Sequence, residues 1–392
     1  MYRWAVVPLV VFTLPAASAA QFKLPMKLAD LEQRARADSN DPAANFNVAL
    51  GYWNAKRWQD ADRALRTAVL LDARFAPAYV ALNYLPYAQR ASLWDEVREN
   101  RVPEEWKARM EESDRLFRHA YMIDPLVELR SGDVVTSRST AYLEVLEQIY
   151  GEHIRDYFDG LDQYFMGEYQ KAYDRFARVI NALDGDRHPD RVPSTVFWWH
   201  ALAAAHVEKW PDATAGLETL IDRSLETTRR DSLVHFPLRT NEFRYVLAYV
   251  KQRSGEVNAA IDLYREAITH DIGLYMAHVR LAEMYETARM FPQAIESRRN
   301  AVNANPENPT LLLDLGKTLA AAGRMSDAAD ALRQATAANP RDPRPPFFLG
   351  LVLEQLDQKD EARTAFNQFI ALAPSRYDRQ IAMAKQHLDA LR

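Results

Sequence analysis

The stretch that decides the fold is residues 275–376, which divides into three consecutive segments of 34 residues. The segments read YMAHVRLAEMYETARMFPQAIESRRNAVNANPEN (275–308), PTLLLDLGKTLAAAGRMSDAADALRQATAANPRD (309–342) and PRPPFFLGLVLEQLDQKDEARTAFNQFIALAPSR (343–376). The positions that recur with this period are Leu281, Leu315 and Leu349, then Ala282, Gly316 and Gly350, then Ala294, Ala328 and Ala362, and finally Pro306, Pro340 and Pro374. A fixed period of this size indicates an array of helix-turn-helix units.

The small residues and the prolines have separate physical roles in such a unit. An alanine or glycine on the first helix lets the second helix approach closely, because no bulky side chain stands between them. Proline lacks the N–H that would continue a helix, so it ends one unit and begins the turn into the next. The pattern therefore predicts an all-α solenoid of helix-turn-helix units.

The same register extends back to Pro42, with an irregular insertion in the middle of the array. We expect a capping helix within 21–41, a solenoid over 42–376 and a second capping helix at 377–392. A helical stripe from Tyr142 to Phe165 predicts one long helix entering the third unit, either continuous or broken near Gly151. About eight units are predicted, at 42–75, 76–125, 153–186, 194–227, 241–274, 275–308, 309–342 and 343–376.

The first complete unit carries the pattern of a known repeat family. It has Val48, Ala49 and Tyr52 on one predicted helix, then Trp58 and Ala61 on the next. This resembles the tetratricopeptide repeat (TPR) family, whose pattern is W-x2-L-G-x2-Y, then A-x3-F, then P. The resemblance covers most of the chain after residue 41 and is best in the last units. It implies a right-handed solenoid with a surface that binds a protein or peptide partner.

The first twenty residues have the pattern of an export signal. Arg3 supplies a positive start, Trp4 to Leu14 an apolar core, and Ala17 to Ala20 a small-residue cleavage site. The alternative is an uncleaved anchor, but the apolar run is shorter than the roughly 20 residues that a span needs and contains Pro8. We expect a cleaved signal peptide at 1–20, no stable membrane span afterwards, and a periplasmic or secreted protein.

Composition narrows the classes of partner. The formal net charge is -5 and no long basic run occurs, so nucleic acid is not an expected partner. The chain has no cysteine. A lipoprotein anchor is therefore excluded, as is any site that needs a thiol.

No residue constellation predicts catalysis or metal binding. The sequence lacks HExxH, GxSxG, P-loop and GxGxxG motifs. His200 and His206 are six residues apart, a spacing that does not place two ligands on one helical face. We expect no enzyme activity, no cofactor and no metal. The alternative of another class is an enzyme with its active site in the irregular region 86–193.

The residues expected to bind a partner lie on the first helix of each unit. In the family that the chain resembles, this helix lines a concave groove, where rigid aromatic side chains can anchor a peptide or a helix. The alternative role for these side chains is packing between units. The groove residues are Phe46, Leu50, Trp53, Tyr84, Trp198, Leu202, Tyr245, Tyr249, Val279, Leu313, Phe347 and Leu351.

Together these features predict a non-enzymatic scaffold or adaptor of the cell envelope. Envelope members of the family, as the resemblance implies, serve assembly of secretion or polysaccharide-export machinery. A subunit of an exopolysaccharide synthesis, export or secretion complex is therefore the alternative within the same class. The oligomeric state is left open.

Overall fold

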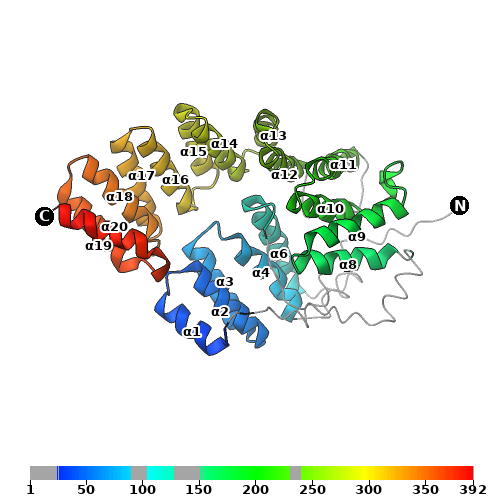
Figure 1. The fold of residues 1–392 in the computed structure, drawn as a ribbon, viewed down its shortest axis with the longest axis horizontal. Helices are drawn as coiled ribbons and strands as arrows, with labels where there is room; N and C mark the ends of the chain where they lie inside the picture. The colour runs from blue at the N-terminus through cyan, green and yellow to red at the C-terminus, as the bar shows by residue number, and fades with distance from the viewer. Residues whose placement is uncertain are drawn as a thin grey trace. The chain divides into compact units, whose positions relative to one another are not determined.

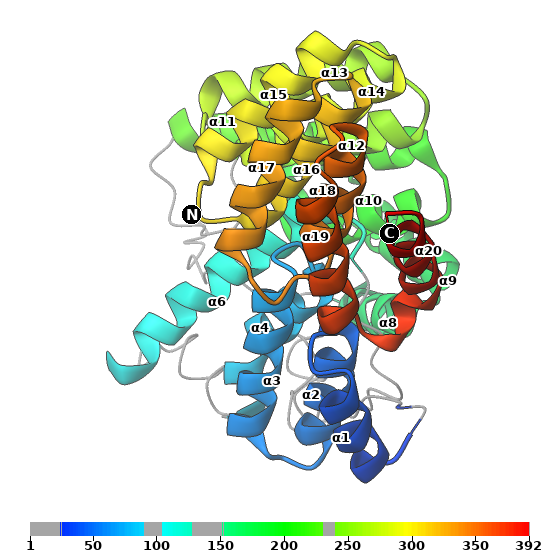
Figure 2. The same cartoon turned by 90° about the vertical axis from the view of Figure 1, so that its left-hand side faces the viewer.

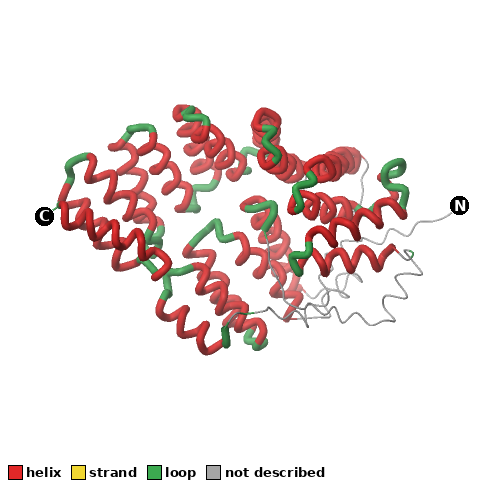
Figure 3. Tube along the Cα trace, viewed as in Figure 1, coloured by secondary structure: helices red, strands yellow, loops and turns green. Residues whose placement is uncertain are grey.

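The chain folds as repeated α-helical hairpins. A computed structural model describes residues 24, 26–89, 104–127, 151, 153–229 and 240–391. These residues form 18 α-helices and two short 3-10 turns, with no β-strand among them (Figure 1, Figure 3). No helix in the described part is both long and apolar enough to cross a bilayer. The predicted all-α repeat fold is confirmed, whereas the predicted signal peptide at 1–20 lies outside the described residues.

The helices belong to two compact units, which are described separately. The first includes Tyr52–Asp62 and Ala76–Glu266. The second consists of Met26–Gly51, Arg63–Phe75 and Ala267–Arg392. Three helices contribute residues to both units: α2 (Pro42–Asn54), α3 (Trp58–Leu71) and α13 (Val257–His270).

In the first unit, α4 packs against α6, the helices from α8 to α12 each pack against the next, and α6 also packs against α12. This last contact includes a hydrogen bond from the Tyr245 hydroxyl to the Met122 carbonyl oxygen at 2.6 Å. The long helix predicted from Tyr142 begins, within the described residues, at His153; residues 142–150 lie outside them. The helices are α4 (Ala76–Gln89), α6 (Glu104–Ile123), α8 (His153–Phe165), α9 (Tyr169–Ala182), α10 (Ser194–His206), α11 (Trp210–Arg229) and α12 (Thr240–Arg253).

In the second unit, α14 to α20 follow one another as packed antiparallel pairs, which Figure 2 shows clearly for α16 to α19. One hydrophobic cluster runs through them from Ile295 to Leu391. Helix α1 (Leu28–Ala37) belongs to the same unit. The paired helices are α14 (Tyr275–Thr287), α15 (Phe291–Ala304), α16 (Pro309–Ala321), α17 (Met325–Ala338), α18 (Arg344–Gln355) and α19 (Lys359–Leu372), and α20 (Asp378–Ala390) follows them.

One backbone conformation recurs at the turn between the two helices of a repeat. Gly255, Arg289, Gly323 and Asp357, each 34 residues after the last, all have a positive φ, between 56° and 87°. The next residue donates its N–H to a carbonyl five residues back, as from Arg324 to Leu319 at 2.9 Å. This left-handed cap satisfies carbonyls at the end of the first helix and reverses the chain. Earlier turns have it at Lys56, Gly167 and Glu208.

A glycine separates the two helices in three of the repeats. A Cβ atom added to Gly316 would lie 2.6 Å from Leu332, and one added to Gly350 would lie 2.7 Å from Phe366. Gly160 has the same relation to Phe176, at 2.8 Å. In each case the large side chain is 16 residues further on, on the second helix. The glycines therefore provide the close approach that the sequence pattern predicts.

Replacing Gly350 with leucine should destabilise the protein. The new side chain would overlap the Phe366 ring, which is fully buried and has no free space to move into. We expect a loss of about 1 to 3 kcal/mol in the free energy of unfolding, measured by urea denaturation. Gln355→Leu adds the same side chain at an exposed site on α18 and should change stability by less than about 0.5 kcal/mol. Equal stability of the two variants would contradict the packing role.

Candidate partner-binding surface

Most of the residues predicted to line the groove are buried. Phe46, Tyr249 and Leu351 are partly buried. Their role in binding a partner stays a prediction, but burial means that most of them already pack against the protein itself. The buried ones are Leu50, Trp53, Tyr84, Trp198, Leu202, Tyr245, Val279, Leu313 and Phe347.

The contacts of these side chains are with neighbouring helices. In the first unit, Trp198 on α10 lies between Tyr121 on α6 and Phe243 on α12, with ring centroids 5.5 and 6.0 Å away. In the second unit, Phe347 on α18 lies 4.9 Å from Phe369 on α19. The aromatic residues thus join helices within each unit, which is the packing role that the sequence left open.

Accessible side chains lie next to the buried ones on the first helices of the last three repeats. Lys317 is 47% exposed, Glu283 35% and Arg280 18%. Arg280, Asp314 and Phe348 each follow a predicted groove residue by one position. This spacing in the sequence could have identified them. We call these side chains, together with the buried Asp314, the first-helix strip: Arg280 and Glu283 on α14, Asp314 and Lys317 on α16, and Phe348 and Leu351 on α18.

The strip is close to neutral and combines charge with apolar area. Arg280 pairs with Glu283 at 3.1 Å and Lys317 lies 3.8 Å from Asp314. The Lys317 ammonium is also 5.5 Å from the centre of the Phe348 ring. Neighbouring charges are thus already compensated, so a strongly charged partner would gain little here. A peptide with both apolar and charged side chains matches this surface better.

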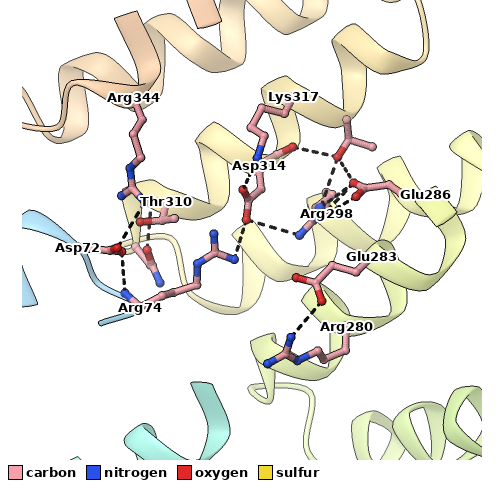
Figure 4. A network of polar contacts seen from close by, with 12 residues as sticks. Asp72, Arg74, Arg280, Glu283, Glu286, Arg298, Thr310, Asp314, Lys317 and Arg344 are labelled. Atoms are coloured by element: carbon pink, nitrogen blue, oxygen red, sulfur yellow. Dashed lines mark hydrogen bonds and ion pairs between the residues drawn. The ribbon is translucent and has the colours of Figure 1, made fainter. Parts of the chain in front are cut away.

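Asp314 is the centre of a network of charged side chains (Figure 4). Its side chain is only 6% exposed, yet three cations surround it. Arg74 approaches its Oδ2 atom at 2.8 Å and Arg298 approaches the same atom at 3.5 Å. A buried carboxylate requires such compensation, because leaving water costs it several kcal/mol.

Arg298 supports this network from the second helix of the preceding repeat. It occupies the position that Leu332 and Phe366 hold in the next two repeats. Its guanidinium donates two hydrogen bonds to Glu286, both of 3.1 Å, in the two-point geometry typical of arginine and carboxylate. Thr318 links Arg298 to α16, because its hydroxyl accepts a hydrogen bond from Arg298 Nε at 3.3 Å and donates one to the Asp314 carbonyl oxygen at 2.9 Å. The buried charges are therefore held in fixed positions.

Arg344, at the start of α18, anchors the edge of the network. It donates to both oxygens of Asp342, at 2.9 and 2.8 Å, and lies 3.4 Å from Asp72. Burial acts to lower the pKa of Arg344, but the hydrogen bonds to Asp342 and the charge of Asp72 outweigh it and raise that pKa above its ordinary value. Arg344 thus stays charged at any pH at which the protein is folded.

A second polar cluster lies in the first unit, between α9, α10 and α11. The His200 ring stacks on Tyr173 at 4.7 Å, and the Tyr173 hydroxyl donates to Asp212 at 2.8 Å. Burial, reinforced by this hydrogen bond, raises the pKa of Tyr173 to about 12. Burial lowers the pKa of His200 to about 4, against an opposing effect of Asp212. Within the described residues, His200 Nε2 has no hydrogen-bond partner. His200 is therefore neutral at neutral pH.

The buried His200 should make stability depend on pH. An unfolded histidine takes up a proton below about pH 6.5, whereas native His200 does so only near pH 4. Stability is therefore lost as pH falls from about 6.5 to 4, and at pH 5 the loss from this group should be about 2 kcal/mol. Urea denaturation at pH 7.5 and 5.0 measures it. The difference should shrink in His200→Phe and persist in His188→Phe, whose side chain is exposed. An unchanged difference in His200→Phe would contradict the assignment.

No group of three histidine or acidic side chains that could hold a metal ion occurs in the part of the chain that the structure describes. Residues 90–103 and 128–150, which belong to the irregular region considered for an active site, lie outside that part. The cluster around His200 contains an acid and a neutral base, but the two groups are used in hydrogen bonding and ring stacking.

A comparison with known protein families matches the repeats that carry the first-helix strip. A tetratricopeptide repeat family model matches residues 280–343 and again 313–377. No curated protein matches the sequence.

Solved structures that resemble the chain include "MamA AMB-1", with 17% identity, a TM-score of 0.36 and coverage of 46% of this chain and 91% of the other. Another is the C-terminal part of a TPR repeat-containing protein from Cytophaga hutchinsonii, with 13% identity, a TM-score of 0.47 and coverage of 60% and 92%. Yeast Tom70 has 12% identity, a TM-score of 0.39 and coverage of 92% and 91%. The helix pairs and their common turn agree with the family match, which identifies residues 280–377 as tetratricopeptide repeats.

Proposed function

We propose that the protein is a non-enzymatic scaffold of the cell envelope that binds a protein partner through the first-helix strip. The observation that carries the proposal is a set of side chains at equivalent positions of three consecutive repeats, among them the accessible Glu283 and Lys317. These side chains lie next to the buried Val279, Leu313 and Phe347. Fixed side chains lose little conformational entropy on binding. The repeats supply the rigidity and the strip supplies the contacts.

The chemistry of the strip favours a peptide or helix with mixed side chains. Phe348 and Leu351 on α18 offer partly buried apolar surface, and α14 and α16 offer paired charges. An amphipathic segment can place apolar residues on the former and polar residues on the latter. This arrangement differs from a clamp for a terminal carboxylate, which needs uncompensated cations.

Site-specific crosslinking tests the proposed surface. A photoreactive phenylalanine analogue at Phe348 should crosslink a partner of defined mass in the envelope fraction of the source cells. The same analogue at Asn367, which is exposed on the second helix α19, is the matched control and should not capture that partner. Lys317→Glu should reduce the yield at position 348 at least tenfold without lowering the melting temperature. Equal capture at both positions would contradict the proposal.

The envelope location rests on the sequence pattern of residues 1–20. If those residues are a cleaved export signal, the mature chain should begin at Ala20 or Gln21, depending on which small-residue site is cut. Mass spectrometry of the protein isolated from fractionated cells measures the new N-terminus. A full-length chain recovered from the cytoplasm would contradict the location and leave the binding surface to be tested by crosslinking.

A further inference from the structure

The second unit contains a contact between segments far apart in sequence that involves the first-helix strip. Arg74 lies in the loop between α3 and α4, and its partner Asp314 is a member of the strip on α16. Both residues belong to the second unit. The chain therefore places one of its own cationic side chains on the surface proposed for a partner.

The loop that carries Arg74 is held in a defined turn. Asp72 Oδ1 accepts the Arg74 N–H at 3.1 Å, and the Asp72 carbonyl oxygen accepts the Phe75 N–H at 3.0 Å. The same turn, in which an aspartate or asparagine accepts the N–H two residues later, follows other repeats at Asp124, Asp271 and Asn339. Arg74 is thus presented by a standard element of the repeat.

Asp314 depends on Arg74 more than on its other cations. Arg298 is further away, at 3.5 Å, and is already engaged by both oxygens of Glu286. Lys317 is 3.8 Å away and 47% exposed. Asp314 Oδ2 accepts no hydrogen bond of good geometry within the described residues, although Arg74 lies 2.8 Å from it. An arginine is therefore the side chain that best compensates this buried carboxylate.

Polar contacts join residues 38–74, here called the N-terminal segment, to the C-terminal repeats. Arg341 donates to Asn40 at 3.1 Å and to the Ser39 carbonyl oxygen at 3.0 Å. Arg376 pairs with Asp41 at 3.1 Å. The remaining contacts are Asn339 to the Leu70 carbonyl oxygen, Asn40 to the Leu372 carbonyl oxygen, Ser375 to Asp38, and Arg344 to Asp72.

Contacts of this kind can be exchanged. Several of these side chains are partly exposed, so water and salt compete for them. The hydrophobic cluster of the C-terminal repeats, as described, is formed by residues from Ile295 onwards and does not include the N-terminal segment. The Arg74 loop can therefore leave its place on α16 without opening that cluster.

We infer that the carboxylate of Asp314 is a binding point for an arginine side chain, occupied by Arg74 in the free protein and taken over by an arginine of the partner peptide. This inference rests on the proposed function, because it assigns the charged part of the partner to α16 and the apolar part to α18. The loop acts as an internal competitor. A partner must bind tightly enough to displace the loop from Asp314. A peptide without an arginine cannot replace the contact that Arg74 makes.

Fluorescence anisotropy with a labelled peptide of residues 70–78, LLDARFAPA, tests the inference. The wild-type protein should bind it weakly, because its own loop has a high effective concentration. Arg74→Ala leaves the Asp314 carboxylate without the Arg74 side chain, and this variant should bind the peptide at least tenfold more tightly than the wild type. The double variant Arg74→Ala/Asp314→Asn should lose this gain. A peptide with citrulline in place of arginine keeps the shape without the charge and should not bind Arg74→Ala.

Two control variants keep the result interpretable. Arg341→Ala removes another contact of the N-terminal segment but leaves Arg74 in place, so it should bind the peptide as weakly as the wild type does. Arg74→Gln removes the charge with little change in volume and should behave like Arg74→Ala if that variant does not fold. Each variant is first compared with the wild type by circular dichroism.

Three results would overturn the inference. The first is equal peptide affinity of the wild type and both Arg74 variants, and the second is equal affinity of the arginine and citrulline peptides. The third is a wild-type mass in solution of twice the monomer that falls to the monomer in Arg74→Ala, since Arg74 would then reach Asp314 of a second copy. Crosslinking at Phe348 does not depend on Arg74, so its success or failure reports separately on the proposed function.

Discussion

The rest of the structure depends on one backbone constraint, the left-handed residue that follows the first helix at the turns described from Lys56 to Asp357. Because it directs the second helix back along the first, it brings Gly316 under Leu332 and Gly350 under Phe366. Glycine adopts this conformation without strain, yet Arg289 and Asp357 do so as well. Packing between the helices therefore stabilises the turn even where the local sequence does not favour it.

The sequence was sufficient to predict the fold because the repeat encodes local contacts. Residues 16 positions apart meet across one turn, so a 34-residue period contains the information for each helix pair. The same reasoning placed the aromatic residues on the first helices, but it did not predict whether they are buried or exposed. Trp198 and Tyr245 are fully buried because helices from neighbouring repeats cover them. Periodicity identifies a helical face, and the neighbouring helix determines whether that face is open.

The charged network could not be predicted in the same way. Arg74 and Asp314 are far apart in the chain and their contact has no periodic counterpart. Arg298 departs from its series, since the equivalent positions hold Leu332 and Phe366. In the sequence, this departure is visible as a charged residue at a position that the repeat pattern expects to be buried. The signal that it gives is that a carboxylate must be nearby, and here that role is filled by Glu286 and Asp314.

The position of Asp314 within the array also has a consequence for folding. Repeats of similar sequence can pair out of register, because their apolar positions are equivalent. At the position of Asp314 the preceding repeat has Arg280 and the following one has Phe348. A shifted N-terminal segment would bring Arg74 against a like charge or an apolar ring, and Asp314 would lose its closest cation. One buried carboxylate thus distinguishes three similar repeats and specifies which of them the N-terminal segment joins.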